Sequence, residues 1–250
     1  MAKRALTREP GLSYNLCISD HPLRYDVHIG KARRQHAAYR EVLTSLGLEV
    51  ILLAREDKLP DSCFVEDTAI IEKNKVFITR MAKEGRRGEE LAIIEALKDH
   101  LQINQANEPA TIEGGDVIHL EDQLIAGITE RTNADGIKQM MEWLAVPVTT
   151  LEALEVMHLK SYVTFLGKNT IIVTEKFAQH PVLEKFEKII VPKFETYAAN
   201  TLTINNVVLM SSNHLKSVGL VREAGFEVIT LDMSEFEKCG GALTCLSLIF

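Results

Sequence analysis

The residues of this sequence with the strongest chemical potential are a cysteine near its last position and a histidine far upstream. Cys245 follows a glycine pair, Gly240-Gly241, and precedes an apolar run that reaches Phe250. The glycine pair permits a tight turn and a close ligand approach. The apolar run predicts a buried strand that holds the thiol in place. A cysteine thiolate is a nucleophile and a histidine such as His158 transfers protons, although both types also occur as ordinary core residues.

Like Cys245 and His158, several carboxylates occur at points in the sequence where an apolar run begins. Glu66-Asp67 and the pair Glu113 and Asp116 stand just before short apolar runs. Several carboxylates around one cavity repel each other unless they share a cation, which could be calcium or magnesium, a basic side chain of the protein, or a substrate. A planar guanidinium fits paired carboxylates with two hydrogen bonds. Its carbon is a poor electrophile, so that cleaving it requires a strong nucleophile and a proton donor.

The spacing of these polar residues is nearly constant. Glu66 and Glu113 are 47 positions apart, His158 follows after 45, Asn200 after 42 and Cys245 after 45. Each leads into two short apolar runs, which is the signature of a repeat architecture. Five strand–strand–helix–strand units of this length need about 225 residues. We therefore predict that residues 1–250 form one α/β domain, a closed five-bladed propeller of ββαβ units with pseudo-fivefold symmetry and a central polar pocket.

The first unit is the least regular in sequence. We predict a first strand over Tyr14–Ser19, a mobile loop over residues 20–29 that could close over the pocket, a helix from Lys31 to a stop at Gly47, and a strand over Glu49–Ala54. Later in the chain, Asn133 is expected to cap a helix.

Composition narrows the class of protein. The net charge of −7 and the pI near 5.7 argue against nucleic acid or an anionic membrane as a partner, and weakly favour a cationic small molecule. Neither a membrane span nor a signal peptide is recognisable, which predicts a cytoplasmic protein. The four cysteines are too far apart for a C-x-x-C pair, so neither a zinc site nor a disulfide scaffold is expected. Cys17 and Cys63 are expected in the core.

Five segments together resemble the motifs of the dimethylarginine dimethylaminohydrolase family, part of the guanidino-group-modifying superfamily. They are Leu59–Asp67 (LPDSCFVED), Gly127–Asn133 (GITERTN), Met157–Lys160 (MHLK), Tyr197–Asn200 (YAAN) and Gly241–Cys245 (GALTC). The resemblance implies the five-bladed α/β propeller (pentein) fold. It also implies hydrolysis of Nω-methylated arginines to citrulline and an amine, with no metal and no organic cofactor.

The resemblance assigns roles by position. It implies that Cys245 is the nucleophile, that His158 is the general acid and then base, and that Glu113 hydrogen-bonds the histidine. It further implies substrate contacts from Glu66 and Asp67 to the guanidinium, from Asp61, Arg86 and Arg131 to the amino-acid end, and from the backbone of Ile18 and Cys239. The family usually carries an acidic residue at the position of Gly240.

Other functions are also compatible with these residues. An arginine deiminase would use the same chemistry on unmethylated arginine, although its members are usually longer than 250 residues. A module that only binds arginine-like amino acids would not need Cys245 or His158. A zinc protein would need more ligands than this pair offers. A homodimer is compatible with the sequence.

Overall fold

Each pair of short apolar runs folds as an antiparallel hairpin, and a third strand then adds parallel to the second. The computed structural model describes residues 4–250, which form five three-stranded sheets of this kind. The sheets have the orders β15-β1-β2, β3-β4-β5, β6-β7-β8, β11-β10-β9 and β12-β13-β14.

The strands and helices have the following bounds. The strands are β1 (Arg4–Arg8), β2 (Glu49–Leu53), β3 (Ala69–Glu72), β4 (Lys75–Ile78), β5 (Gln102–Gln105), β6 (Val117–His119), β7 (Leu124–Ile128), β8 (Val148–Glu152), β9 (Val163–Gly167), β10 (Thr170–Thr174), β11 (Glu187–Val191), β12 (Leu202–Ile204), β13 (Val207–Ser211), β14 (Glu227–Leu231) and β15 (Ser247–Ile249). The α-helices are α1 (Ile29–Ser45), α2 (Leu91–Leu97), α3 (Ala134–Leu144), α4 (Leu215–Glu223) and α5 (Ser234–Glu237).

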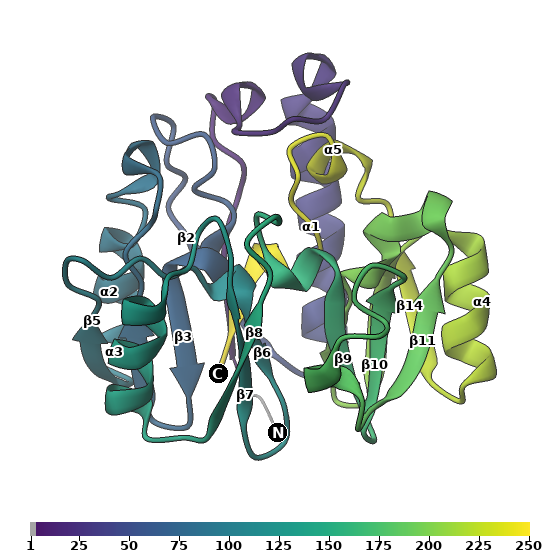
Figure 1. The fold of residues 1–250 in the computed structure, drawn as a ribbon. Helices are drawn as coiled ribbons and strands as arrows, with labels where there is room; N and C mark the ends of the chain where they lie inside the picture. Colours follow the sequence, from purple (N-terminus) through teal and green to yellow (C-terminus); the bar gives the residue numbers. More distant parts are fainter. Residues whose placement is uncertain (1–3) are drawn as a thin grey trace.

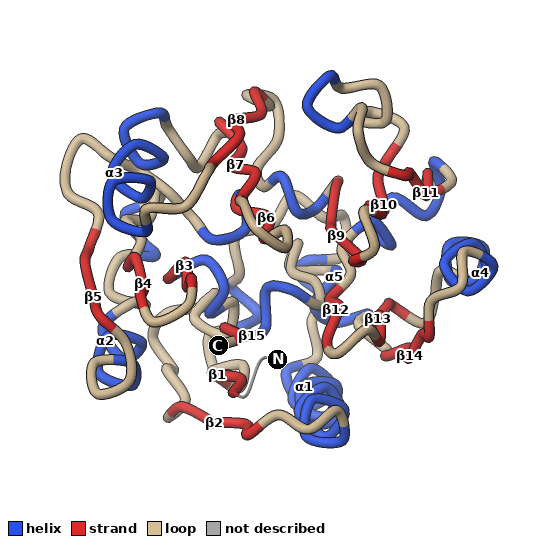
Figure 2. The backbone as a smooth tube through the Cα atoms, turned by 90° about the horizontal axis from the view of Figure 1, so that it is seen from below, coloured by secondary structure: helices blue, strands red, loops and turns tan. Residues whose placement is uncertain are grey.

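The sheets stand around a central axis like blades. Viewed along that axis, β3, β6, β9, β12 and β15 surround the centre, while β2, β5, β8, β11 and β14 lie toward the rim with α1 to α4 (Figure 2). Buried apolar clusters fill the spaces, the largest around Tyr14, Tyr39 and Phe236. This arrangement confirms the predicted five-bladed α/β propeller.

The last strand closes the ring onto the first. β15 pairs antiparallel with β1, with Leu6 opposite Leu248, and β2 adds parallel to β1. The fifth blade therefore combines β1 and β2 with β15, which come from opposite ends of residues 4–250, and α2 and α3 lie on the other side of the molecule from α4 (Figure 1). Among the described residues 4–250, no helix is both long and apolar enough to cross a membrane.

The prediction of a first strand over Tyr14–Ser19 was wrong. The first strand is β1, and Tyr14–Leu16 form a 3-10 turn. The Tyr14 ring is fully buried, packs against Phe64 and Phe236 and donates from its hydroxyl to the Glu235 carbonyl, so that tertiary packing decides the local structure. Two other expectations are confirmed: α1 ends just before Gly47, which has φ +89, and the Asn133 side chain accepts from the Gly136 N–H at the start of α3. The helix α1 begins at Ile29, however, two residues before the predicted start and inside the predicted loop.

Candidate active site

Five equivalent turns carry the polar residues that recur in the sequence. Each inner strand is preceded by a 3-10 turn at one end of the ring. These turns are Val65–Thr68, Gly114–Asp116, Leu159–Ser161, Lys193–Ala199 and Thr244–Leu246. Because the turns occupy the same place in each blade, residues distant in sequence converge near the axis.

Most of the predicted site residues line one small cavity of about 20 Å³. Its walls are Ile18, Asp61, Phe64, Asp67, Arg86, Arg131, Met157, His158, Cys239, Gly240, Gly241 and Cys245. Of the ten predicted site residues, eight are among them; Glu113 lies directly behind the cavity and Glu66 is turned away from it. The thiol and the imidazole thus face the same space.

His158 is held among carboxylates. Its Nε2 lies 2.8 Å from Oε2 of Glu113, which is fully buried, and 3.7 Å from Oδ1 of Asp67. Burial by itself would lower the pKa of His158, but the charge of Asp67, the hydrogen bond to Glu113 and the charge of Asp116 raise that pKa to about 9. The imidazole is therefore protonated at neutral pH and ready to donate.

Asp67 is bound from two sides. Its Oδ1 accepts from the Gly115 N–H at 3.1 Å, and its Oδ2 accepts from Nη1 of Arg86 at 2.8 Å. Burial would raise the pKa of Asp67, but His158 and Arg86 together lower it, so that this carboxylate stays ionised. A charged acceptor consequently faces the cavity beside His158.

The Arg86 guanidinium is surrounded by carboxylates. Besides Asp67, it donates from Nε and Nη2 to both oxygens of Glu89, at 3.0 and 2.8 Å, and lies 3.6 Å from Glu113. Asp67, Glu113 and His158 hold ligand atoms within 4.8 Å of one another, a grouping that a metal ion could also use. Arg86 already supplies a positive charge there.

The Arg131 guanidinium, unlike that of Arg86, has donors that make no hydrogen bond within residues 4–250. It is 3% exposed and its Nη1 lies 3.8 Å from Glu113, yet its Nε and Nη1 have no hydrogen-bond partner within residues 4–250. Buried donors without a partner are costly unless a ligand satisfies them. Asp61, across the same cavity, accepts from the Ile18 N–H at 3.2 Å. The cavity therefore presents separate acceptors and donors suited to an amino-acid end.

Glu66 faces the opposite side of the turn. Its Oε1 accepts from Lys160 Nζ at 2.6 Å and its Oε2 accepts from the Thr244 hydroxyl at 2.6 Å. It lines a second cavity of about 310 Å³ between the inner strands, together with Lys160 and Thr244. The two adjacent acids therefore face different cavities: Asp67 lines the small cavity, and Glu66 lines the larger one.

Cys245 is partly buried at the start of the turn into β15. Burial, with the nearby charges of Glu66 and Asp67, raises the pKa of its thiol well above the usual value. A cation bound at those carboxylates would reverse the charge contribution. Gly240 has φ +69, a conformation that favours glycine, and a Cβ on Gly241 would lie 2.1 Å from the Phe64 ring, so that the chain before the thiol requires glycine at 241.

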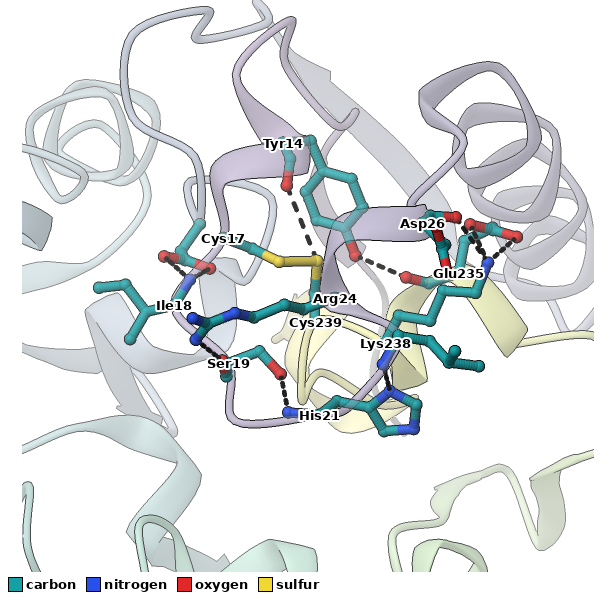
Figure 3. Close-up of a disulfide and its surroundings, with 12 residues drawn as sticks. Tyr14, Cys17, Ile18, Ser19, His21, Arg24, Asp26, Glu235, Lys238 and Cys239 are labelled. Carbon is teal, nitrogen blue, oxygen red and sulfur yellow. Dashed lines mark hydrogen bonds and ion pairs between the residues drawn. A yellow bond between two sulfur atoms is a disulfide. The ribbon is translucent and has the colours of Figure 1, made fainter.

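The expectation that the chain forms no disulfide was wrong. Cys17 and Cys239 are bonded, with Cα atoms 5.7 Å apart and a sequence separation of 222 (Figure 3). The distance between the two cysteines along the sequence did not predict the bond, because the closed ring brings the loop after β1 against the segment before β15. Cys63 is buried, as predicted, and Cys17 is buried within its disulfide.

Several residues of the site were missed in the sequence. Glu89 binds Arg86, Lys160 pairs with Glu66, and Asn200 bonds the Thr244 hydroxyl and accepts from the Thr244 N–H. Lys160 and Asn200 belong to the recurring motifs, which was a usable signal. Glu89 stands three residues after Arg86, a spacing that is common on exposed helices and therefore carries little information.

Comparison with known proteins agrees with this geometry. The sequence profile of the family described as "N,N dimethylarginine dimethylhydrolase, eukaryotic" matches residues 13–248. The N(G),N(G)-dimethylarginine dimethylaminohydrolase of Pseudomonas aeruginosa is 33% identical over 235 residues, covering 89% of this chain and 92% of that protein. The enzyme of the same name from Streptomyces coelicolor is 34% identical over 250 residues, covering 98% of this chain and 96% of that protein.

A solved structure gives the same result in three dimensions. A P. aeruginosa member of this family, complexed with citrulline, superposes over all of both chains with a TM-score of 0.95 and 30% sequence identity. Profile, relatives and fold agree over nearly the whole length, and the chain belongs to the dimethylarginine dimethylaminohydrolase family.

Proposed function

We propose that this protein hydrolyses Nω-methylated arginines, such as asymmetric dimethylarginine and monomethylarginine, to citrulline and dimethylamine or methylamine. The observation that carries the proposal is the shared cavity of Cys245, His158 and Asp67, with Arg131 and Asp61 on the same walls. One cavity therefore holds the nucleophile, the proton donor and the guanidinium acceptor together with the residues that we assign to the amino-acid end.

The substrate is held at both ends in this proposal. The ionised Asp67 binds the guanidinium, and Glu66 contributes negative charge from behind it. The Nε and Nη1 of Arg131, which have no hydrogen-bond partner among residues 4–250, take the α-carboxylate, with Arg86 adding positive charge nearby, while Asp61 takes the α-ammonium. The backbone at Ile18 and Cys239 completes the walls.

Three proton transfers follow from the charge states. The bound guanidinium favours the thiolate of Cys245, since a nearby cation lowers a thiol pKa, and its proton passes to solvent because His158 is already protonated. The thiolate attacks the central carbon. His158 protonates the departing amine, leaving a covalent thiouronium, and the now neutral imidazole takes a proton from the water that releases citrulline. Glu113 holds the ring in position throughout.

Product analysis tests this function. Purified protein is incubated with asymmetric dimethylarginine, monomethylarginine and arginine, and citrulline and free amine are measured. We expect citrulline and dimethylamine from the first substrate, and no turnover by Cys245→Ser, a small change that leaves the fold intact. Citrulline from arginine alone would identify an arginine deiminase, and binding without citrulline would identify a binding module.

We further propose that residues 1–250 act as one catalytic domain, in the cytoplasm, and as a homodimer. The continuous ring of blades supports the single domain. Size-exclusion chromatography with light scattering measures the oligomeric state.

A further inference from the structure

The Cys17–Cys239 disulfide joins two walls of the active-site cavity. Cys17 directly precedes Ile18, which lines one side, and Cys239 precedes Gly240 and Gly241, which line the other. Cys17 itself does not line the cavity. The disulfide therefore connects a residue outside the cavity to one in its wall.

The Ile18 side of the cavity depends on where Cys17 is held. The Ile18 N–H donates to both oxygens of Asp61, at 3.2 and 3.4 Å, and Asp61 is 3% exposed. Burial raises the pKa of Asp61, and the hydrogen bond from Ile18 opposes that shift. Displacing Cys17 would therefore disturb the acceptor that we assign to the substrate α-ammonium group.

The same C-terminal segment also anchors the far end of the loop. Lys238 Nζ donates to the Asp26 carbonyl at 2.9 Å (Figure 3), and the His28 N–H donates to Glu235 at 2.8 Å. The loop of residues 18–27 is thus attached at both ends to residues 235–239. Its middle is exposed, with Tyr25 79% accessible.

The cavity is small compared with a substrate, so that part of its wall has to move before the substrate enters. A volume of about 20 Å³ holds roughly one water molecule, which is far less than an amino acid needs. With Cys17 covalently fixed to Cys239, the Ile18–Asp61 wall keeps its position when other parts of the wall move. A preorganised wall pays less ordering entropy when substrate binds.

We propose that Cys17 is a positioning residue for substrate, and that its bond to Cys239 makes substrate affinity depend on the oxidation state of this pair. The inference rests on the proposed function of the site. With the bond intact, Ile18 and Asp61 stand fixed opposite Cys245. With the bond reduced, the first part of the loop is held by hydrogen bonds and packing, and the amino-acid end of the substrate binds less tightly.

The redox step is an ordinary thiol–disulfide exchange with a dithiol. A thiolate of the dithiol attacks one sulfur of the pair, forming a mixed disulfide and releasing the other cysteine as a thiolate. The second thiol of the reductant then closes its own disulfide and releases the first cysteine. Two electrons pass from the dithiol to the cystine, and both cysteines end as thiols. Cys17 and Cys239 are buried, so that dithiothreitol reaches their disulfide slowly. A count of free thiols therefore establishes that a sample is fully reduced.

The test compares oxidised and dithiothreitol-reduced wild-type protein with Cys17→Ser under both conditions. We expect reduction of the wild type to raise KM for asymmetric dimethylarginine by roughly three- to tenfold, with kcat within about twofold, the size expected from losing one or two ordered groups. Cys17→Ser should have the raised KM in both conditions. Cys63→Ala, which alters a buried cysteine outside the disulfide, should keep the wild-type response to reductant.

Two outcomes would overturn the proposal: an unchanged KM in wild type whose thiol count shows full reduction, or a KM of Cys17→Ser that still responds to reductant. A purely structural disulfide would lower the melting temperature and the fraction of active protein while leaving KM alone. If the protein turns over no methylarginine, the loop is tested by the rate of Cys245 alkylation with iodoacetamide, followed by peptide mass spectrometry. That rate should rise on reduction of the wild type and not of Cys17→Ser, and an equal rate in both states of the wild type would contradict the proposal.

Discussion

At the scale of single residues, the state of His158 decides the chemistry. Its ring faces Asp67 and Glu113, and its turn is held by Asp116, whose Oδ1 accepts from the Leu159 N–H at 2.8 Å. These carboxylates keep the imidazole charged despite its burial. In the mechanism that we propose, His158 therefore works first as an acid.

This charge state predicts the alkaline limit of the activity. We expect kcat/KM to fall as the pH rises through about 9, because the neutral imidazole no longer protonates the leaving amine. The measurement is initial rates of citrulline formation between pH 6 and about 10.5. Circular dichroism over the same range separates titration from unfolding, and a rate that still increases well above pH 9 in folded protein would contradict the assignment.

Residue types and spacing in the sequence predicted that Cys245, His158 and Asp67 share a site, and the structure places all three on one cavity. They could not separate Glu66 from Asp67, because neighbouring residues of a 3-10 turn point in different directions and only the fold shows which faces the cavity. Nor could they identify Glu89, whose importance comes from being 1% exposed beside Arg86. Burial of a charge is a property of the tertiary structure.

At the scale of elements, the turn Gly114–Asp116 shows how a short segment positions the site. A Cβ added to Gly115 would lie 2.9 Å from Asp67 Oδ1 and from His158 Cγ. A Cβ added to Gly114 would instead lie 2.0 Å from the backbone oxygen of Glu66. Gly115 thus leaves space for side chains of the site, and Gly114 leaves space for the backbone of the neighbouring turn.

The two alanine variants should therefore fail differently. Gly115→Ala should lower kcat/KM by about a hundredfold with little change in melting temperature, since the clashing side chains can shift but then lie out of position. Gly114→Ala should cost about 3 kcal/mol of stability, because backbone has to move. Steady-state kinetics and thermal melts measure both.

Gly219→Ala is the matched control for this pair. Gly219 lies in α4 with no atom within 4 Å of its added Cβ among the residues described, so this change should leave activity unaltered and stability equal or higher. Equal losses of activity from Gly114→Ala and Gly115→Ala, without a difference in stability, would argue against separate roles.

The elements themselves were largely predictable, because the hairpins, α1 and the α3 cap follow local patterns. The segment from Tyr14 to Ser19 was not. Its apolar residues resemble a strand, but Tyr14 packs into the core and Cys17 bonds a residue 222 positions away. Contacts of such sequence separation leave no local signal.

At the scale of the whole molecule, a network across the axis joins blades that are far apart in the chain. Glu66 accepts from Lys160 and Thr244, and Asn200 bonds the Lys160 carbonyl and Thr244. Each of these residues comes from a different blade. The repeat in the sequence predicted this convergence, but not that Glu66 and Asn200, two of the recurring positions, contact other blades rather than the small cavity.

Removing the charge at the centre of that network should destabilise the ring. Lys160→Met would leave the Glu66 carboxylate buried without its cation, which costs about 3–5 kcal/mol. For a chain of this size we expect the melting temperature to fall by roughly 10 °C. Differential scanning calorimetry measures the change. The double variant Lys160→Met/Glu66→Gln should recover part of the loss, and a double variant as unstable as the single one would show that the pair is not the source.

The pairing of β15 with β1 has a consequence for how the polypeptide can be cut. Phe250 and Arg4 exchange two backbone hydrogen bonds, at 2.8 and 3.0 Å, as residues do beside a hairpin turn. In the other blades, a turn between consecutive strands joins the corresponding pair. An example is Asn205-Asn206 between β12 and β13, where both residues have positive φ. An Asn-Gly link from Phe250 to Arg4 would rebuild the missing turn. A circular permutant with its new termini between Asn205 and Asn206 should then fold into the same five blades.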